Sequence, residues 1–186
     1  MTSPDRPLVA PDFAVPHPPA TDRFRLEPLG PQHNAADHAA WTSSIAYIRA
    51  NPDFTGRSWP PPGGMPLEAN LDDLRRHAQD FDRRVGFTYT VLSVPGDDVI
   101  GCVYIYGSRQ DPGVTGVRSW VRADHASLDA ELYRVVSDWL AREWPFERVA
   151  YAPRVSPNGG ELGRMSRKLN EPELNEPETE TAAQGS

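Results

Sequence analysis

The stretch that decides the fold reads VIGCVYIY at residues 99–106 and, after a turn, SWVRADHASLDAELYRVVSDWL at residues 119–140. The first run is apolar at nearly every position, which predicts a central strand covered on both faces. In the second run, apolar residues recur at spacings of three and four from Leu128 onward, which predicts an amphipathic helix. Ser127 is a plausible N-cap for this helix, and Asp129 in its first turn favours the positive end of the helix dipole.

Further elements extend outward from this stretch. Strand patterns cover residues 24–29, 87–94, 99–106, 117–122 and 146–152, and helix patterns cover residues 31–50, 66–85 and 128–140. The order is therefore β-α-α-β-β-β-α-β, an α/β (α+β) fold with a mixed sheet, because a helix between the last two strands allows a right-handed parallel crossover. Residues 51–64 contain three consecutive prolines and cannot form regular structure.

Composition divides the chain into one domain and two tails. All but one of the aromatic residues lie between residues 24 and 151. We therefore predict a domain at residues 23–153, which leaves a Pro-rich flexible arm at residues 1–22. The remainder, residues 154–186, is predicted to be a disordered acidic tail, because its tandem LNEPE repeat is acidic and lacks aromatic residues.

Charge and cysteine content narrow the class of protein. The net charge is −7, but five glutamates lie in residues 169–186, so the body is close to neutral. A near-neutral body lacks the basic face that non-specific nucleic-acid binding requires, and it gives no reason to expect an anionic membrane as a partner. Cys102 is the only cysteine, no signal-peptide pattern occurs, and no apolar run is long enough to span a membrane. We predict a cytoplasmic protein with a buried, inert Cys102.

The element order, the isoleucine–glycine step in VIGCVYIY and the strand-to-helix segment at residues 119–140 resemble the GNAT superfamily of N-acyltransferases over about residues 23–153. The resemblance implies a fourth strand that splays from the fifth and pairs with the pantetheine arm of acetyl-CoA. It also implies that amides at the following helix start hold the pyrophosphate. The matching positions, as candidate coenzyme contacts, are Val121, Arg122, Ala123, Asp124, His125 and Ser127.

This loop departs from the family's pattern. Asp124 stands near the family's Arg or Gln, and Ser127 and Asp129 stand where glycines occur. An aspartate adds negative charge beside a phosphate, which Arg122 and His125 offset in part. The helix and strands that usually follow in the family, with a tyrosine general acid, have no counterpart here, and the edge left exposed suggests a homodimer.

Two functions stay open at this point. One is an acyl-CoA-dependent N-acyltransferase that transfers an acetyl group to an amine of a small molecule or peptide. The alternative is a catalytically inactive GNAT-like binding or regulatory module that has lost coenzyme A binding. The first predicts acetyl-CoA as donor substrate, and the altered loop favours the second.

Four aromatic residues are candidates for binding the substrate. Tyr104 and Tyr106 lie on the central strand, Trp120 lies on the next strand, and Trp59 lies in the Pro-rich loop that in the family often covers the acceptor site. Core packing is the alternative interpretation for the tyrosines and for Trp120. For Trp59 the alternative is a stiff surface crossing.

Candidates for catalysis are Tyr106, at the end of its strand, and His125, before the long helix, because either could transfer a proton near a bound amine. A solvated capping role is the alternative for His125. The pair His33 and His38 lies five residues apart, which is not the i, i+4 spacing of a helical metal pair. We therefore predict no metal site.

Overall fold

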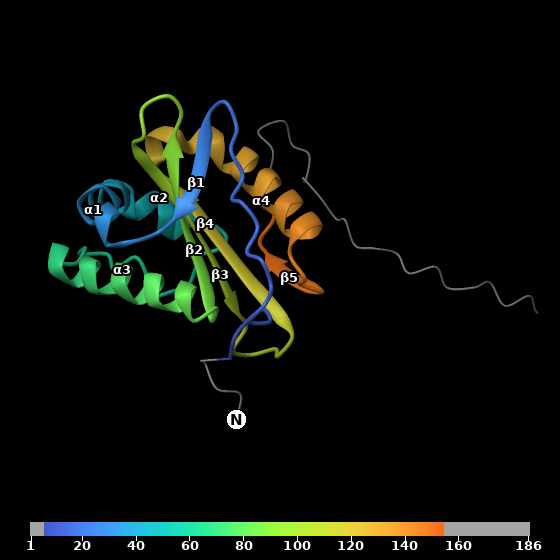
Figure 1. Cartoon of the computed structure of the whole chain (residues 1–186). Coiled ribbons are helices and arrows are strands. Elements are labelled where there is room, and N and C mark those ends of the chain that lie inside the picture. Colours follow the sequence, from blue (N-terminus) through green and yellow to red (C-terminus); the bar gives the residue numbers. More distant parts are fainter. Residues whose placement is uncertain (1–5, 155–186) are drawn as a thin grey trace, which may run out of the picture.

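The computed structural model describes residues 6–154, and its five strands form one sheet in the order β1-β2-β3-β4-β5 (Figure 1). The first four strands pair antiparallel, and the last pairs parallel to its neighbour. The strands are β1 (Phe24–Pro28), β2 (Gly86–Ser93), β3 (Val99–Gly107), β4 (Val114–Val121) and β5 (Arg148–Tyr151). The predicted mixed sheet and order of elements are thus confirmed.

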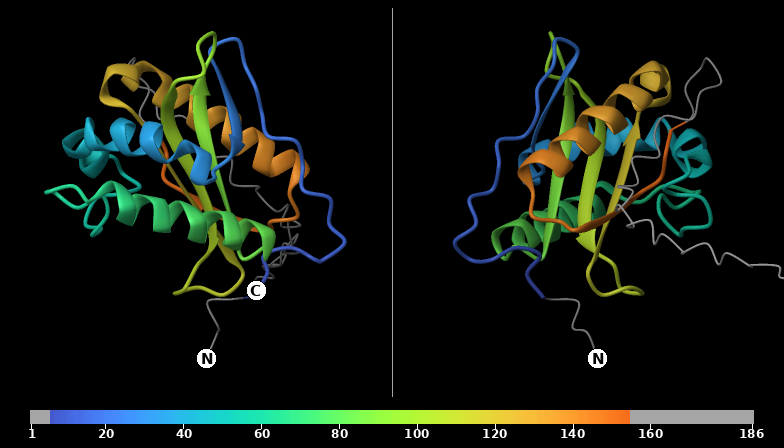
Figure 2. Two further views of the ribbon diagram at one scale, coloured as in Figure 1. Left: turned by 60° about the vertical axis from the view of Figure 1, so that its left-hand side comes forward. Right: turned by 90° about the vertical axis from the view of Figure 1, so that its right-hand side faces the viewer.

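Helices cover both faces of this sheet. On one face lie α1 (Asn34–Thr42), α2 (Ile45–Ala50) and α3 (Leu67–Asp82), and on the other lies α4 (Asp129–Glu143), the crossover between β4 and β5 (Figure 2). Two short 3-10 helices, η1 (Pro31–His33) and η2 (Ala123–Leu128), precede α1 and α4. None of the helices within residues 6–154 has the length and apolar character needed to cross a membrane.

Two hydrophobic cores result, one on each face of the sheet. Neighbouring residues of β3 divide between them: Cys102 packs with Trp41 under α1 and α3, whereas Val103 packs with Leu132 under α4. All four side chains are completely buried. The prediction of a central strand covered on both sides is therefore confirmed, and burial raises the pKa of the Cys102 thiol well above its usual range, which keeps it protonated.

The structure corrects two helix predictions. The helix expected at residues 31–50 is broken at Ser43 and Ser44, where the Ser43 hydroxyl donates to the Ala40 carbonyl and so competes with helix continuation. The predicted N-cap Ser127 lies inside η2 instead, and α4 begins after Leu128 with no side-chain cap.

The N-terminal arm also differs from the prediction. The sequence predicts a flexible arm at residues 1–22; residues 1–5 lie outside the described residues, and beyond them Val9 is 6% exposed and belongs to the core under α4. The Leu8 amide donates to the Arg84 carbonyl at 2.8 Å, and Arg84 Nη1 donates to the Phe13 carbonyl at 2.6 Å. A few apolar side chains between the prolines are enough to hold this segment alongside the sheet (Figure 1).

The domain extends one residue further toward the C-terminus than the predicted boundary at residue 153. The sequence predicts a disordered tail at residues 154–186, but Arg154 is buried, at 3% exposure. The rest of that predicted tail, residues 155–186, lies outside the described residues.

The packing of the arm gives a stability prediction. We expect Val9→Ala to lower the free energy of unfolding by about 2 kcal/mol, because it removes two buried methyl groups and leaves a cavity. Leu67→Ala is the control, since Leu67 is 42% exposed and its truncation should cost less than about 0.5 kcal/mol. Urea unfolding of both variants measures the difference, and equal stabilities would mean that the arm is not part of the core.

Candidate functional site

The sheet opens where β4 passes the end of β5. The two strands pair over four residues each, from Val114 with Arg148 to Val117 with Tyr151. Beyond Val117, β4 continues to Val121 and remains paired with β3 on its other side. A gap therefore separates the last residues of β4 from the chain that follows β5, at the place where the resemblance implies a splay.

The side chain of Arg154 fills this gap. Its Nη2 donates to Asp53 Oδ2 at 2.8 Å and to the Ser119 carbonyl at 3.0 Å. Its Nε donates to Asp129 Oδ2 at 2.7 Å, and its Nη1 to the Ala152 carbonyl at 2.7 Å. The guanidinium thus joins the loop after α2, the strand β4, the chain after β5 and the start of α4. We call Asp53, Asp129 and Arg154 the buried triad.

Asp53 also holds the backbone on both sides of the gap. Its Oδ2 accepts from the Ser119 amide at 3.0 Å, and its Oδ1 accepts from the Ala152 amide at 3.2 Å. Ser119 is on the part of β4 that extends beyond its pairing with β5, which the resemblance assigns to a pantetheine arm. While these contacts are made, the side chains of Asp53 and Arg154 fill the gap, and the gap does not fit a pantetheine arm.

Three of the six predicted coenzyme-contact residues bond to one another. Arg122 donates to Asp124, and His125 Nδ1 lies 2.8 Å from Asp124 Oδ1. The Ala123 amide donates to the Ser44 hydroxyl at 2.9 Å. Arg122 and Asp124 thus form a surface ion pair. Such a pair is the alternative to anion binding by Arg122. The remaining two candidates are divided, with Val121 in the core under α4 and Ser127 exposed on η2.

A second feature, a cavity of about 200 Å³, lies on the face of the sheet covered by α1 and α3. Its lining combines aromatic and ionisable side chains and includes Asp37, Phe54, Trp59, His77, Tyr104 and Arg118. The cavity adjoins the gap along the chain, because Phe54 follows Asp53 and Arg118 precedes Ser119. We call it the α1–α3 cavity.

Asp37 is the most unusual group in this cavity. It is 4% exposed, and no salt bridge reaches its carboxylate from any residue between 6 and 154; its Oδ2 accepts only from Asn70 Nδ2, at 3.1 Å. Burial raises the pKa of Asp37 to about 6, against the opposing influence of the Asn70 hydrogen bond and of His33 and His38, with a smaller contribution from Asp73 in the same direction as burial. A carboxyl group with such a pKa can gain or lose a proton near neutral pH.

His77 is the second proton-transfer candidate. Its Nδ1 lies 2.7 Å from the Tyr106 hydroxyl, which donates to Asp80 Oδ2 at 3.1 Å. The Thr88 hydroxyl lies 3.1 Å from the same Nδ1, so His77 belongs to a hydrogen-bonded group with Thr88, Tyr106 and Asp80. Burial, followed by the charge of Arg76, lowers the pKa of His77 to about 4, so the ring is neutral at pH 7.

The candidate substrate residues divide between this cavity and its surroundings. Trp59 and Tyr104 line the cavity, with ring centroids 6.0 Å apart. Trp120 is completely buried behind them and donates its indole N–H to the Tyr104 hydroxyl at 3.2 Å, while Tyr106 contacts His77. Sequence reasoning missed Asp37 and His77 as site residues. The available signal was their spacing, since Asp37 is one helical turn before Trp41 and His77 is one turn after Leu74.

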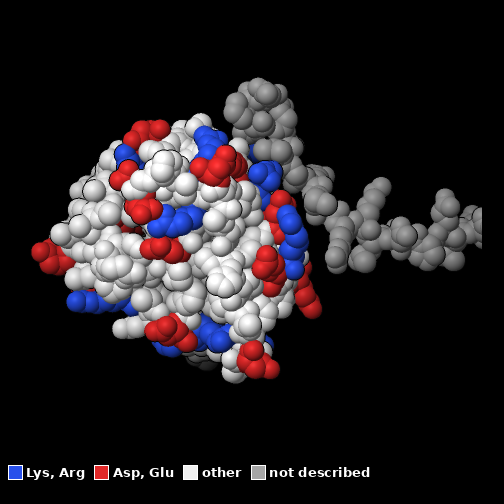
Figure 3. All heavy atoms as spheres, turned by 45° about the horizontal axis from the view of Figure 1, so that its top comes forward, with Lys and Arg blue, Asp and Glu red and all other residues white. Residues whose placement is uncertain are grey.

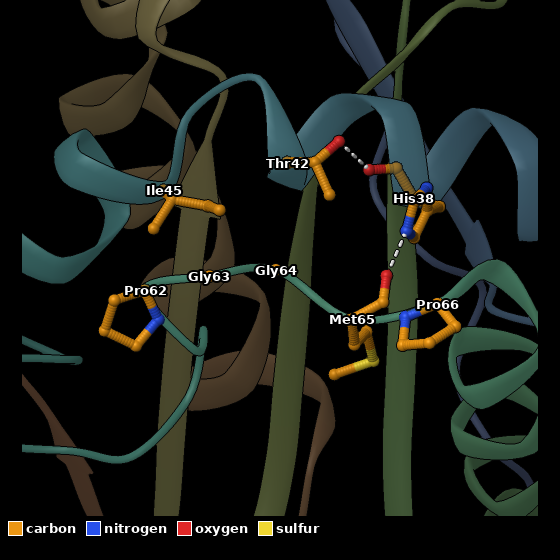
Figure 4. A pocket seen from close by; sticks show the side chains of 8 residues that line it. All are labelled: His38, Thr42, Ile45, Pro62, Gly63, Gly64, Met65 and Pro66. Carbon is orange, nitrogen blue, oxygen red and sulfur yellow. Dashed lines mark hydrogen bonds between the residues drawn. The ribbon is translucent and has the colours of Figure 1, made fainter.

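A larger, shallow depression of about 620 Å³ lies between α1 and residues 62–66 (Figure 4). No charged Asp, Glu, Lys or Arg lines it, and its polar groups bond to the backbone. His38 Nε2 donates to the Met65 carbonyl at 2.7 Å, and the Thr42 hydroxyl donates to the His38 carbonyl at 2.6 Å. The His38 Nε2–H and the Thr42 hydroxyl proton are therefore both used by the backbone.

Metal and polyanion sites find little support in the part of the chain that the structure describes. No group of three or more His, Cys, Asp or Glu side chains there is arranged to hold a metal ion. The two histidines considered for metal binding are engaged elsewhere, His33 with Glu27 at 2.7 Å and His38 with the backbone. On the face seen in Figure 3, acidic and basic side chains are interspersed without a patch of one sign.

Comparison with protein-family models and with curated protein sequences found no match. Solved structures of GNAT acetyltransferases do match. A ribosomal L7/L12 α-N-protein acetyltransferase has a TM-score of 0.57 at 12% identity and covers 78% of this chain and 76% of its own. The ribosomal-protein-S5-alanine acetyltransferase from Vibrio fischeri has a TM-score of 0.55 at 10% identity, covering 72% of each chain. The microcin C7 self-immunity acetyltransferase, solved with acetyl-CoA and AMP, has a TM-score of 0.53 at 8% identity, covering 70% of this chain and 68% of its own. The chain thus has the GNAT fold.

The raised pKa of Asp37 predicts how stability depends on pH. Because the pKa of Asp37 rises from the ordinary 3.8 to about 6 on folding, its ionisation opposes folding. This penalty is absent below about pH 4 and complete above about pH 6, where it amounts to about 3 kcal/mol at 1.36 kcal/mol per pKa unit. We expect Asp37→Asn, which keeps the bond from Asn70, to be more stable than the parent at about pH 7.5 and equally stable at about pH 4. Urea unfolding at the two pH values measures this, and an advantage that does not change with pH would contradict it.

Proposed function

We propose, from the premise of the GNAT fold, that this protein is an acyl-CoA-dependent N-acyltransferase that acetylates an amine of a small molecule or peptide. The observation that carries the proposal is the buried, unpaired carboxylate of Asp37 in a cavity next to the splayed part of β4. A charge kept in such a place opposes folding, which is typical of functional sites.

The residues of the cavity suit the acceptor side of this reaction. An amine must be neutral to attack an acyl carbonyl, so a group that accepts its proton is required. Asp37, with a pKa of about 6, is ionised at pH 7 and is the proposed base, and the neutral ring of His77 is a second candidate. Acetyl-CoA would supply the thioester carbonyl. To pair with β4, its pantetheine arm would have to displace the contacts of Asp53 and Arg154 with Ser119.

The filling of the gap by Asp53 and Arg154 favours a second candidate function, an inactive GNAT-like module that binds a small ligand or a partner. In this alternative the buried triad replaces the coenzyme permanently, and the α1–α3 cavity is a binding site without chemistry. A homodimer is compatible with both functions, since β5 is a four-residue edge strand on which Val149 is 42% exposed.

Coenzyme binding separates the two functions. The first measurement is the thermal stability of the full chain with and without about 1 mM acetyl-CoA. A ligand at ten times its Kd stabilises the folded state by about 1.4 kcal/mol, so the acyltransferase proposal predicts a clear rise in Tm. The double variant Asp53→Asn/Arg154→Met, which opens the gap without leaving Asp53 charged, should show a larger rise. Arg142→Met is the matched control, because the Arg142 side chain is 75% exposed and bonds only at the surface.

Each pattern of results supports one function. A rise in the parent means that the gap opens for the coenzyme. A rise in the double variant alone means that the triad excludes the coenzyme and favours the inactive module. With no rise in either protein, and with circular dichroism showing that both are folded, the acyltransferase proposal fails.

Acetyl transfer itself should depend on Asp37. We expect Asp37→Asn to lower kcat by about 10² to 10⁴, the usual contribution of general-base catalysis. In the parent, kcat/KM should rise with pH through about pH 6 as Asp37 loses its proton, and this limb should be absent from the variant. The assay is release of free thiol from acetyl-CoA with a panel of amines. Asp72→Asn, at an exposed position on α3, is the control and should retain the parent's rate and pH profile.

A further inference from the structure

Four charged side chains line the α1–α3 cavity, and only two of them pair with each other. Asp73 and Arg76, one turn apart on α3, form an ion pair of 2.8 Å at the partly exposed edge. The other two are Asp37 on α1 and Arg118 on β4. The cavity therefore has no net charge with Asp37 ionised, yet it retains one carboxylate and one guanidinium without ionic partners.

The guanidinium of Arg118 is held by aromatic rings. It lies 6.0 Å from the ring centroid of Phe54 and 5.7 Å from that of Tyr104. Among residues 6–154 it has no carboxylate within 4 Å and no hydrogen-bond acceptor, and burial followed by the charge of Arg57 lowers its pKa, although an arginine stays cationic. A guanidinium placed on aromatic faces keeps its N–H donors available to a planar anion such as a carboxylate.

Asp37 supplies the opposite charge in a fixed orientation. Asn70 donates one amide hydrogen to Asp37 Oδ2, and its own Oδ1 accepts from Trp41 Nε1 at 2.9 Å. This chain fixes the Asn70 amide, so the carboxylate has one bonded oxygen and no cation. An ammonium group would relieve the cost of burying this charge.

The geometry points to a small zwitterion as the ligand of this cavity, namely an α-amino acid or a close analogue. Its ammonium would bind Asp37, its carboxylate would bind Arg118, and an apolar side chain would lie against Phe54 and Trp59. The volume of about 200 Å³ equals about seven water molecules at ~30 Å³ each, which suits a single amino acid better than a peptide. Binding of the amino acid requires no acyl donor. The inference therefore rests on the proposed function only where it makes the amino group of this ligand the acyl acceptor.

This pairing would also help release the product. Acylation replaces the ammonium by a neutral amide and leaves the carboxylate unchanged. The product would keep its contact with Arg118 and lose the ionic contact with Asp37, so it would bind less tightly than the substrate.

The test is isothermal titration calorimetry of the full chain without any acyl donor. L-Leucine and L-phenylalanine are compared with 3-methylbutylamine and 2-phenylethylamine, which lack the carboxylate, and with 4-methylpentanoate and 3-phenylpropanoate, which lack the amine. At least one of the amino acids should bind at least about tenfold more tightly than both of its analogues. Equal affinity for an amino acid and an analogue, or no binding of either amino acid, would overturn the inference.

Two variants test which charged group of the ligand each side chain binds. Arg118→Met should abolish the preference over the amine while keeping the preference over the acid, and Asp37→Asn should do the reverse. Arg75→Met, an exposed position on α3, should bind like the parent. A preference over the amine that survives in Arg118→Met would show that Arg118 does not bind the carboxylate.

Failure of this inference is distinguishable from failure of the proposed function. Acetylation of amines that lack a carboxylate, with no binding of amino acids, would support the acyltransferase and reject the zwitterion. Amino-acid binding with no thermal shift from acetyl-CoA would do the opposite.

Discussion

The salt bridge between Arg154 and Asp53 is the interaction on which the arrangement around β4 depends. Both side chains are almost fully buried, and the pair bonds to the backbone on both sides of the gap in the sheet. Burying either charge alone would be very unfavourable, and removing one partner of a buried pair typically costs about 3–5 kcal/mol. Asp129 adds a second carboxylate at the start of α4. One guanidinium therefore fixes a loop, a strand and a helix relative to one another.

The position of the α1–α3 cavity follows from this constraint. Asp53 is held against β4, so Phe54 is directed to the rings of Trp59 and Tyr104 and forms part of the cavity wall. Ser119 is held on the other side, and its neighbour Arg118 reaches the same rings. Opening of the gap would consequently change the shape of the cavity, so the gap beside β4 and the α1–α3 cavity are mechanically linked.

Much of the fold could be predicted from the sequence, because it depends on local patterns. The unbroken apolar run of β3 and the periodic apolar stripe of α4 each identify an element without information from distant residues. Those same patterns do not locate the site. Arg154 follows the last patterned strand and precedes a polar tail, so composition placed it outside the domain. The spacing of Asp37 from Trp41 places both on one helix face, but only tertiary packing shows how deeply the carboxylate is buried.

The separation of the buried pair along the chain has a consequence for folding. Arg154 and Asp53 are 101 residues apart, and Arg154 is synthesised after every element of the sheet. Closing so long a loop is entropically costly and slow compared with forming α3 or the β2–β3 hairpin. During synthesis, Asp53 and the end of β4 must stay hydrated until the guanidinium arrives. The buried triad can therefore form only after the last strand of the sheet has been synthesised.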